Sequence, residues 1–484
     1  MAWVTTPSMR EGLAAGDLSA EGLVHASLSR ARASEDRISA LLATDEPRSL
    51  GLARRADARL EAGERGPVLG LPVVLKDNLH WEGVPCTSGS RILEGYLAPY
   101  SATVVTRLLE AGAVPVAKAN MDEFAMGSSG EFSAFGPTRN PWDPTRVPGG
   151  SSSGSAAAVA AGYVPMALGS DTGGSVRLPA AFCNLTALRP TYGVLSRHGV
   201  TALASSLDQV GPLARTAEDV AALLSVMAGA DPLDSTSVDL PRREALWPLA
   251  SAELKGLRIG LPTEYFGEGL EPGVRAAVEG ALRVFTEAGA EVRPVSLPHT
   301  DQAIDTYYLV CTSEVSANLS RFDGLRFGLS RRDSGGSLAE ITALTREAGF
   351  GIEAKRRILL GTFCLSKGHY EAFYLKALKA RTLIRQDFLD AFAQVDVLAA
   401  PVSPTVAFPL GAKLSDPRAM HLADVYAVGA PLAGLPALAF PAGFSAGLPV
   451  GMQLMGPSLS DVRLLEIAQA FQDRTDFHLR TPQP

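Results

Sequence analysis

Apolar residues along the chain alternate between short continuous runs and helical periodicity, which is the pattern of an α/β protein. The run Val68–Leu75 predicts a buried strand that ends at Lys76. The stretch Ser101–Ala111 has helical spacing and precedes a second apolar strand, Val114–Ala117. This alternation favours an α/β architecture. The same succession of strand, helix and strand recurs at Leu257–Leu261, Pro272–Ala288 and Glu291–Val295.

Between these elements the pattern is more varied. Residues 8–35 predict two short helices, and the alanine-rich stretch Ser155–Ala161 predicts a helix small enough to pack closely on a sheet. The strand Val164–Leu168 runs directly into the glycine-rich turn Asp171–Ser175. Thr216 is expected to cap an amphipathic helix that ends at Met227.

The last third of the chain begins with a helical region and then returns to strands. Residues near 300–390 are mostly helical in pattern and more charged than the rest. No fixed-period repeat and no low-complexity linker interrupts the chain. The sequence therefore predicts one domain over residues 1–484, with a helical elaboration near 300–390. The elements after it are expected at Val395–Ala400, Ala437–Phe440, Val450–Leu454 and Ser460–Phe471.

Composition narrows the class of protein. The chain has 484 residues, of which 46% are hydrophobic, and a net charge of −7 without a long basic block. We therefore expect a globular enzyme that does not grip nucleic acid by itself. Met1–Pro7 lacks a signal-peptide pattern, and the longest apolar run, Ala156–Leu168, contains Gly162 and Pro165. Scattered cysteines and histidines show no metal-binding spacing, so we expect reduced thiols, a cytoplasmic location, no membrane and no metal.

Two glycine- and serine-rich loops provide candidate chemistry. They are Pro148–Ser155 and Asp171–Arg177. In the second loop Ser175 follows two glycines after a predicted strand, which suits a nucleophile. The alternative is an ordinary turn serine. Glycines leave backbone N–H groups free to hold a developing oxyanion, and the expected donors are those of Thr172, Gly173, Gly174 and Ser175 itself.

Lys76 and Ser151 complete a possible catalytic set without histidine. Burial at a strand end would lower the pKa of Lys76 and allow it to act as a base; the alternative is a lysine whose amine reaches water. Ser151 could relay a proton between Lys76 and Ser175. Its alternative role is to cap the alanine-rich helix. Together the three residues indicate an amide-cleaving enzyme.

Two other interpretations of the first loop are weaker. Gly150–Gly154 matches the pattern G-x-S-x-G with Ser152 at its centre, but the nucleophile of that motif must follow a strand. Here three prolines precede it within residues 140–148. Phosphate binding is the second interpretation, and the pattern G-x-x-x-x-G-K-[ST] is absent.

With Lys76 and the two loops at these spacings, the chain resembles the amidase signature family over nearly its whole length. Within that family it is most similar to the glutamine-hydrolysing subunits of tRNA-dependent amidotransferases. One departure is Ser153, where the family often has glycine. Four stretches carry the closer resemblance: Met121–Gly127, Ala204–Pro212, Asn318–Gly324 and Lys355–Phe363.

The resemblance implies a fold and a set of residue roles. The fold is a single large mixed β-sheet covered by helices on both faces. Ser175 is the acylated nucleophile, Ser151 the bridging serine after a cis peptide bond, and Lys76 the base. In the substrate pocket, Arg357 holds the glutamine carboxylate, Asp424 holds its ammonium group, and Tyr308 lines the same pocket. Sequence pattern alone would instead place Arg357 on an exposed basic helix.

The resemblance also implies partners. Two further subunits complete a heterotrimer, ATP with magnesium binds at one of these partners, and misacylated tRNA is held by the partner. The present chain needs no cofactor of its own. Two alternatives stay open, a free-standing amidase that acts on other small amides and a catalytically silent assembly subunit. Whether Glu-tRNA(Gln), Asp-tRNA(Asn) or both are served is left open.

Overall fold

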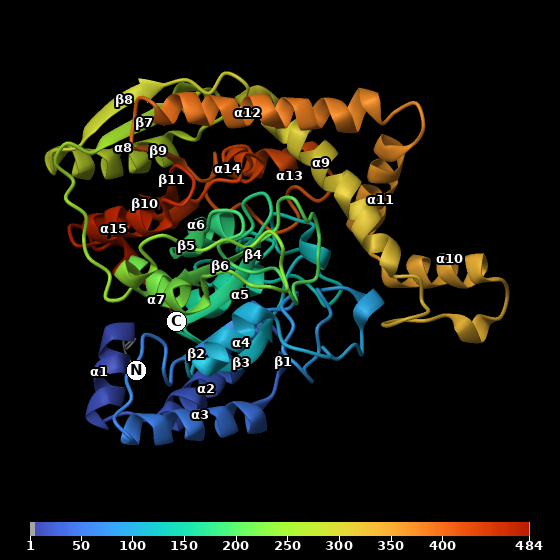
Figure 1. The fold of residues 1–484 in the computed structure, drawn as a ribbon, viewed down its shortest axis with the longest axis horizontal. Coiled ribbons are helices and arrows are strands. Elements are labelled where there is room, and N and C mark those ends of the chain that lie inside the picture. Colours follow the sequence, from blue (N-terminus) through green and yellow to red (C-terminus); the bar gives the residue numbers. More distant parts are fainter. Residues whose placement is uncertain (1–4, 484) are drawn as a thin grey trace.

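An eleven-stranded mixed sheet runs through the whole molecule in the computed structural model, which describes residues 5–483 (Figure 1). Met1–Val4, the first part of the segment without a signal-peptide pattern, lie outside the described residues. In sheet order the strands are β1 Leu41–Thr44, β3 Val114–Ala119, β2 Pro72–Lys76, β4 Met166–Asp171, β6 Gln209–Ala214, β5 Thr186–Arg189, β10 Ala437–Ser445, β11 Leu448–Met455, β9 Val397–Pro401, β7 Arg258–Pro262 and β8 Glu291–Val295.

Parallel and antiparallel pairs alternate in blocks across this sheet. Strands β3, β2 and β4 are mutually parallel, as are β9, β7 and β8. The central strands from β4 to β9 pair antiparallel. The predicted mixed sheet is confirmed.

Helices cover both faces of the sheet, as predicted. On β2, the side chain of Val74 belongs to a core with helices of residues 20–61 and 153–160, whereas Val73 and Leu75 belong to a core with helices of residues 103–110 and 217–227. This alternation follows from the two-residue period of a strand. The helices are α1 Thr6–Ala15, α2 Ala20–Ile38, α3 Glu46–Glu61, α4 Thr103–Glu110, α5 Ser153–Ala160, α6 Arg177–Cys183, α7 Ala217–Met227, α8 Pro272–Glu287, α9 Ala303–Asn318, α10 Leu338–Gly349, α11 Ile352–Leu365, α12 Lys376–Phe392, α13 Pro417–His421, α14 Gly429–Ala433 and α15 Asp461–Gln472.

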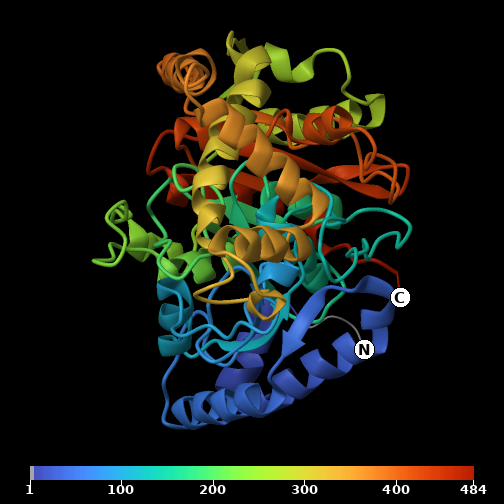
Figure 2. The same cartoon turned by 90° about the vertical axis from the view of Figure 1, so that its right-hand side faces the viewer.

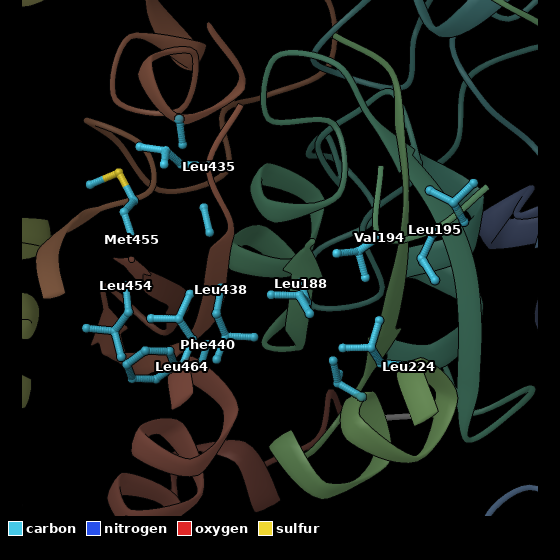
Figure 3. Close-up of a cluster of buried hydrophobic side chains, with 14 of the residues drawn as sticks. Leu188, Val194, Leu195, Leu224, Leu435, Leu438, Phe440, Leu454, Met455 and Leu464 are labelled. Atoms are coloured by element: carbon cyan, nitrogen blue, oxygen red, sulfur yellow. The ribbon is translucent and has the colours of Figure 1, made fainter. Parts of the chain in front are cut away.

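Figure 3 shows how the core continues from the central strands to the outer helices. Leu438 and Phe440 of β10 pack with Leu454 of β11 and Leu464 of α15 in one apolar cluster. All four side chains are fully buried. Burial of each such side chain contributes about 1.5–3 kcal/mol relative to exposure, so this layer holds the central strands firmly in register.

Several predicted elements are confirmed and others need correction. Strand β2 ends at Lys76, the side chain of Thr216 caps α7, and β8 has the predicted bounds. The prediction of two short helices over residues 8–35 is wrong for the second, because α2 continues for 19 residues to Ile38. Helices α9 to α12 occupy most of residues 303–392.

Candidate active site

Lys76 lies at the carboxyl end of β2, between β3 and β4, and is completely buried. Its Nζ donates to the hydroxyl oxygens of Ser151 at 2.8 Å, Ser152 at 2.9 Å and Ser170 at 2.9 Å. Burial lowers the pKa of Lys76 to about 7, although the carboxylates of Asp122 and Asp171 oppose this effect. Because the amine is buried, it does not reach water. Because its pKa is about 7, a large fraction of it is neutral near pH 7.

Ser151 follows a cis peptide bond with Gly150, as the resemblance implied. Helix α5 begins at Ser153 with Ser152 at its N-cap position, and no side chain caps it. The alternative role of Ser151 as a helix cap is therefore wrong. Its fully buried hydroxyl instead accepts a hydrogen bond from Lys76.

Ser152 supports the lysine rather than standing free. Its hydroxyl donates to the Ser170 carbonyl at 3.2 Å and accepts from Lys76. The close approach of Ser152 to strand β4 requires a glycine at position 169, since a Cβ there would lie 2.6 Å from the Ser152 hydroxyl oxygen. A strand does not precede Ser152, so the strand–serine–helix interpretation is wrong.

Ser175 lies in the turn between β4 and α6, beside the lysine cluster. The Ser152 N–H donates to the Ser175 carbonyl at 3.1 Å, which ties the two serine-rich loops together. Ser175 is 8% exposed, whereas Lys76 and Ser151 are at 0%. Of these three residues, only Ser175 is accessible to a substrate.

One of the four backbone N–H groups around Ser175 is bonded within the fold and three are not. The Gly174 N–H donates to Asp171 Oδ1 at 3.0 Å, so this predicted oxyanion donor is already occupied. Within residues 5–483, the N–H groups of Thr172, Gly173 and Ser175 donate to no protein acceptor. Three donors are thus available in one turn.

A buried charge network that the sequence did not predict fixes this turn. Asp171 forms an ion pair with Arg177 at 3.1 Å and with Arg189 at 3.4 Å. Burial opposes ionisation of Asp171, but the two guanidinium groups outweigh it and lower its pKa to about 2. Arg177 also donates to Gln453 Oε1 of β11 at 2.7 Å. Because Gln453 is 276 residues away, only the fold reveals this contact.

The three predicted pocket residues come together next to Ser175. Arg357 on α11 is 6% exposed, so its placement on an exposed basic helix is wrong. Its guanidinium carbon lies 5.2 Å from the ring centre of Tyr308 on α9. A Cβ on Gly174 would be 3.8 Å from Asp424 Oδ1, which places that carboxyl group close to the serine turn.

Two further polar residues that the sequence did not single out contact this pocket. Glu353 accepts from Arg357 Nε at 2.7 Å, one helical turn away on α11. Ser128 donates to the Asp424 carboxyl group. Burial raises the pKa of Asp424 to about 7, partly offset by Ser128 and Arg357. The i, i+4 spacing of Glu353 and Arg357 was a visible signal in the sequence, whereas Ser128 and Asp424 are 296 residues apart.

Residues 5–483 contain no group of three or more His, Cys, Asp or Glu side chains that could hold a metal ion. The four cysteines are buried and unpaired with one another. No helix over the same range is long and apolar enough to cross a membrane.

Comparison with known proteins gives a consistent result. The family described as Amidase matches residues 22–465. The chain is 52% identical over 481 residues to a glutamyl-tRNA(Gln) amidotransferase subunit from Chloroflexus aurantiacus, covering 99% of this chain and 98% of that protein. It is 54% identical over 471 residues to the protein of the same name from Myxococcus xanthus, covering 97% and 96%. The crystal structure of a Thermotoga maritima protein, also of that name, superposes with a TM-score of 0.77 at 39% identity, covering 94% and 92%.

Proposed function

Since the chain belongs to the amidase signature family, we propose that its Lys76–Ser151–Ser175 cluster hydrolyses glutamine as the glutaminase subunit of a tRNA-dependent amidotransferase. The observation that carries this proposal is the buried Lys76 amine, 2.8 Å from the Ser151 hydroxyl and beside the accessible Ser175.

The proposed reaction begins with attack of Ser175 on the side-chain amide carbon of glutamine. The Ser175 proton passes to Ser151 while the Ser151 proton passes to neutral Lys76. The N–H groups of Thr172, Gly173 and Ser175 stabilise the oxyanion. The Gly174 N–H, which the sequence also predicted as a donor, bonds instead to Asp171.

The second half of the reaction returns the protons. The Lys76 ammonium group protonates the leaving nitrogen through Ser151, so ammonia departs and a glutamyl ester remains on Ser175. Water then attacks this ester with Lys76 again acting as the base. Glutamate leaves and Ser175 recovers its proton, so the cycle consumes one glutamine and one water.

The pocket charges favour glutamine over an uncharged amide. Arg357 binds the α-carboxylate, Asp424 binds the α-ammonium group, and Tyr308 lines the space between them. An aliphatic or aryl amide carries neither charged group, so it would gain no charge pairing from Arg357 or Asp424. This argument favours the glutaminase over a free-standing amidase for apolar substrates.

The assembly is part of the same proposal. Two partner subunits form a heterotrimer with this chain in the cytoplasm; one binds ATP with magnesium and presents the misacylated tRNA. The ammonia from Ser175 converts Glu-tRNA(Gln), Asp-tRNA(Asn) or both to the amide. The chain's charge of −7 fits an arrangement in which partners hold the RNA. Residues 1–484 act as one amidase domain.

Co-expression with the partner subunits tests this function. The purified complex is assayed with ATP and with Glu-tRNA(Gln) or Asp-tRNA(Asn), using glutamine or ammonium chloride as nitrogen donor. We expect the Ser175→Ala complex to lose glutamine-dependent amidation and to retain the ammonium-dependent reaction. A Ser175→Ala complex that still uses glutamine, or a wild-type complex that uses only ammonium, would contradict the proposal.

A further inference from the structure

Helix α11 has an inverted distribution of polar and apolar residues. Its buried face carries Glu353 and Arg357. Its outward face carries four large apolar side chains, which we call the α11 stripe. These are Ile352, Leu359, Leu360 and Phe363, with exposed fractions of 69%, 71%, 42% and 46%. A surface helix ordinarily shows the reverse arrangement.

Three members of the stripe, Leu359, Leu360 and Phe363, are neighbours on the helix, whereas exposed Arg356 separates Ile352 from them. The members of the stripe follow helical spacing along α11, and the Phe363 ring lies 4.1 Å from that of His369 and 5.6 Å from that of Phe373. Helices α10 and α11 project beyond the sheet in Figure 1, and both lie across the front in Figure 2. Contiguous exposed apolar surface of this kind marks an interaction site.

Charge around the α11 stripe indicates the chemistry of its partner. Residues 319–385 contain thirteen Lys and Arg against six Asp and Glu, so this segment carries +7 in a chain whose total is −7. Exposed Arg356 lies within the stripe and pairs with Glu353, and exposed Lys367 lies just beyond its end. The charged phosphate groups of RNA would not cover exposed aliphatic side chains. An acidic protein that also carries apolar residues therefore fits this surface better than RNA does.

We propose that the α11 stripe is the docking surface for a partner subunit, namely an acidic protein whose apolar side chains cover it. This inference rests on the proposed function, in which the chain is one subunit of a larger enzyme. Leu359 and Phe363 are the proposed anchors, since they are neighbours one helical turn apart and Leu359 is the most exposed member of the stripe.

Docking on this face also reaches the substrate pocket. The helix that would be covered on its outer side holds Arg357 on its inner side. Gly361 lets α11 pack directly on α9, because a Cβ there would lie 1.9 Å from the Thr312 carbonyl oxygen. Helix α9 carries Tyr308, so a partner that fixes α11 also fixes Arg357 against Tyr308. Assembly therefore tightens glutamine binding.

The test compares wild-type chain, Leu359→Ser/Phe363→Ser and the control Leu233→Ser, whose leucine is 65% exposed elsewhere on the chain. Each is titrated with the purified partner subunits by calorimetry, and glutamine affinity is measured with and without them. We expect at least about 30-fold weaker partner binding for the double variant, an unchanged control, and unchanged thermal midpoints. Partner subunits are expected to strengthen glutamine binding to wild type but not to the double variant at equal concentration.

The outcomes separate the two proposals. Failure of the wild-type chain to bind the partner subunits would overturn the proposed function itself. Equal binding by wild type and double variant would overturn the docking surface alone. A wild-type dimer that the double substitution dissociates would assign the stripe to a second copy of this chain. Loss of tRNA binding with normal partner binding would assign it to RNA, and either result overturns the inference.

Discussion

Replacing Lys76 by methionine removes a titrating amine while keeping a side chain of similar length. Burial takes the pKa of Lys76 from its ordinary value of 10.5 to about 7 in the folded chain. Between these two values the unfolded chain binds more protons than the folded one, so the free energy of unfolding rises with pH. The linkage relation gives about 2 kcal/mol of added stability between pH 7 and pH 9 from this one residue.

The assay is chemical denaturation of wild type and Lys76→Met at several pH values between 7 and 9. All other titrating groups are shared, so the difference between the two curves isolates Lys76. We expect that difference to change by about 2 kcal/mol across this range. Lys379→Met, which removes an exposed lysine on α12, serves as the control and should follow wild type.

Catalysis gives the second measurement on the same variant. Loss of the base should lower kcat for glutamine hydrolysis by at least about 1000-fold. In wild type, kcat should fall about tenfold per pH unit below pH 7, because Lys76 becomes protonated. A stability difference that stays constant from pH 7 to 9, or near-normal hydrolysis by Lys76→Met, would refute a neutral buried base.

Three further predictions concern the pocket and its support. Arg357→Met should raise KM for glutamine about 100-fold with a smaller change in kcat, since the carboxylate loses its charged partner; an unchanged KM would contradict this role. The wild-type KM should rise as pH falls through about 7, because the buried Asp424 carboxyl becomes neutral. Asp424→Asn should raise KM above pH 7 toward the low-pH value of wild type and abolish this dependence. Gly361→Ala should lower the free energy of unfolding by about 1–3 kcal/mol, because the added methyl group would clash with the Thr312 carbonyl. Gly280→Ala is the control, since its methyl group would meet only Arg283 at 3.5 Å. Equal thermal midpoints for wild type and Gly361→Ala would refute tight α9–α11 packing.

Many of the helices and strands could be predicted from local sequence patterns with a direct physical meaning. The apolar run before Lys76 indicated a buried strand, although the strand begins only at Pro72, and Thr216 had the residue type and position of a helix cap. Strands β5 and β6 were not predicted. The first has four residues, and the second contains Gly211 and Pro212, so neither shows a strand pattern without its neighbours.

In the candidate site, too, some residues could be predicted from the sequence and others could not. The three residues proposed as catalytic stood in short motifs that point to one family, so the sequence was enough to propose them. Their supports come from the fold. Ser170 reaches Lys76 across the β2–β4 pair, and Arg177 reaches Gln453 on a strand far along the chain. Long-range pairs of this kind leave no local pattern, because their members are spaced by topology rather than by helix or strand period.

Trapping the covalent intermediate shows directly which serine is the nucleophile. The assembled enzyme is mixed with glutamine, quenched in acid during turnover, digested and examined by mass spectrometry. We predict a glutamyl adduct on Ser175 in the wild-type enzyme and none in Ser175→Ala. An adduct on Ser151 or Ser152 instead, or steady ammonia release without any adduct on Ser175, would contradict the account.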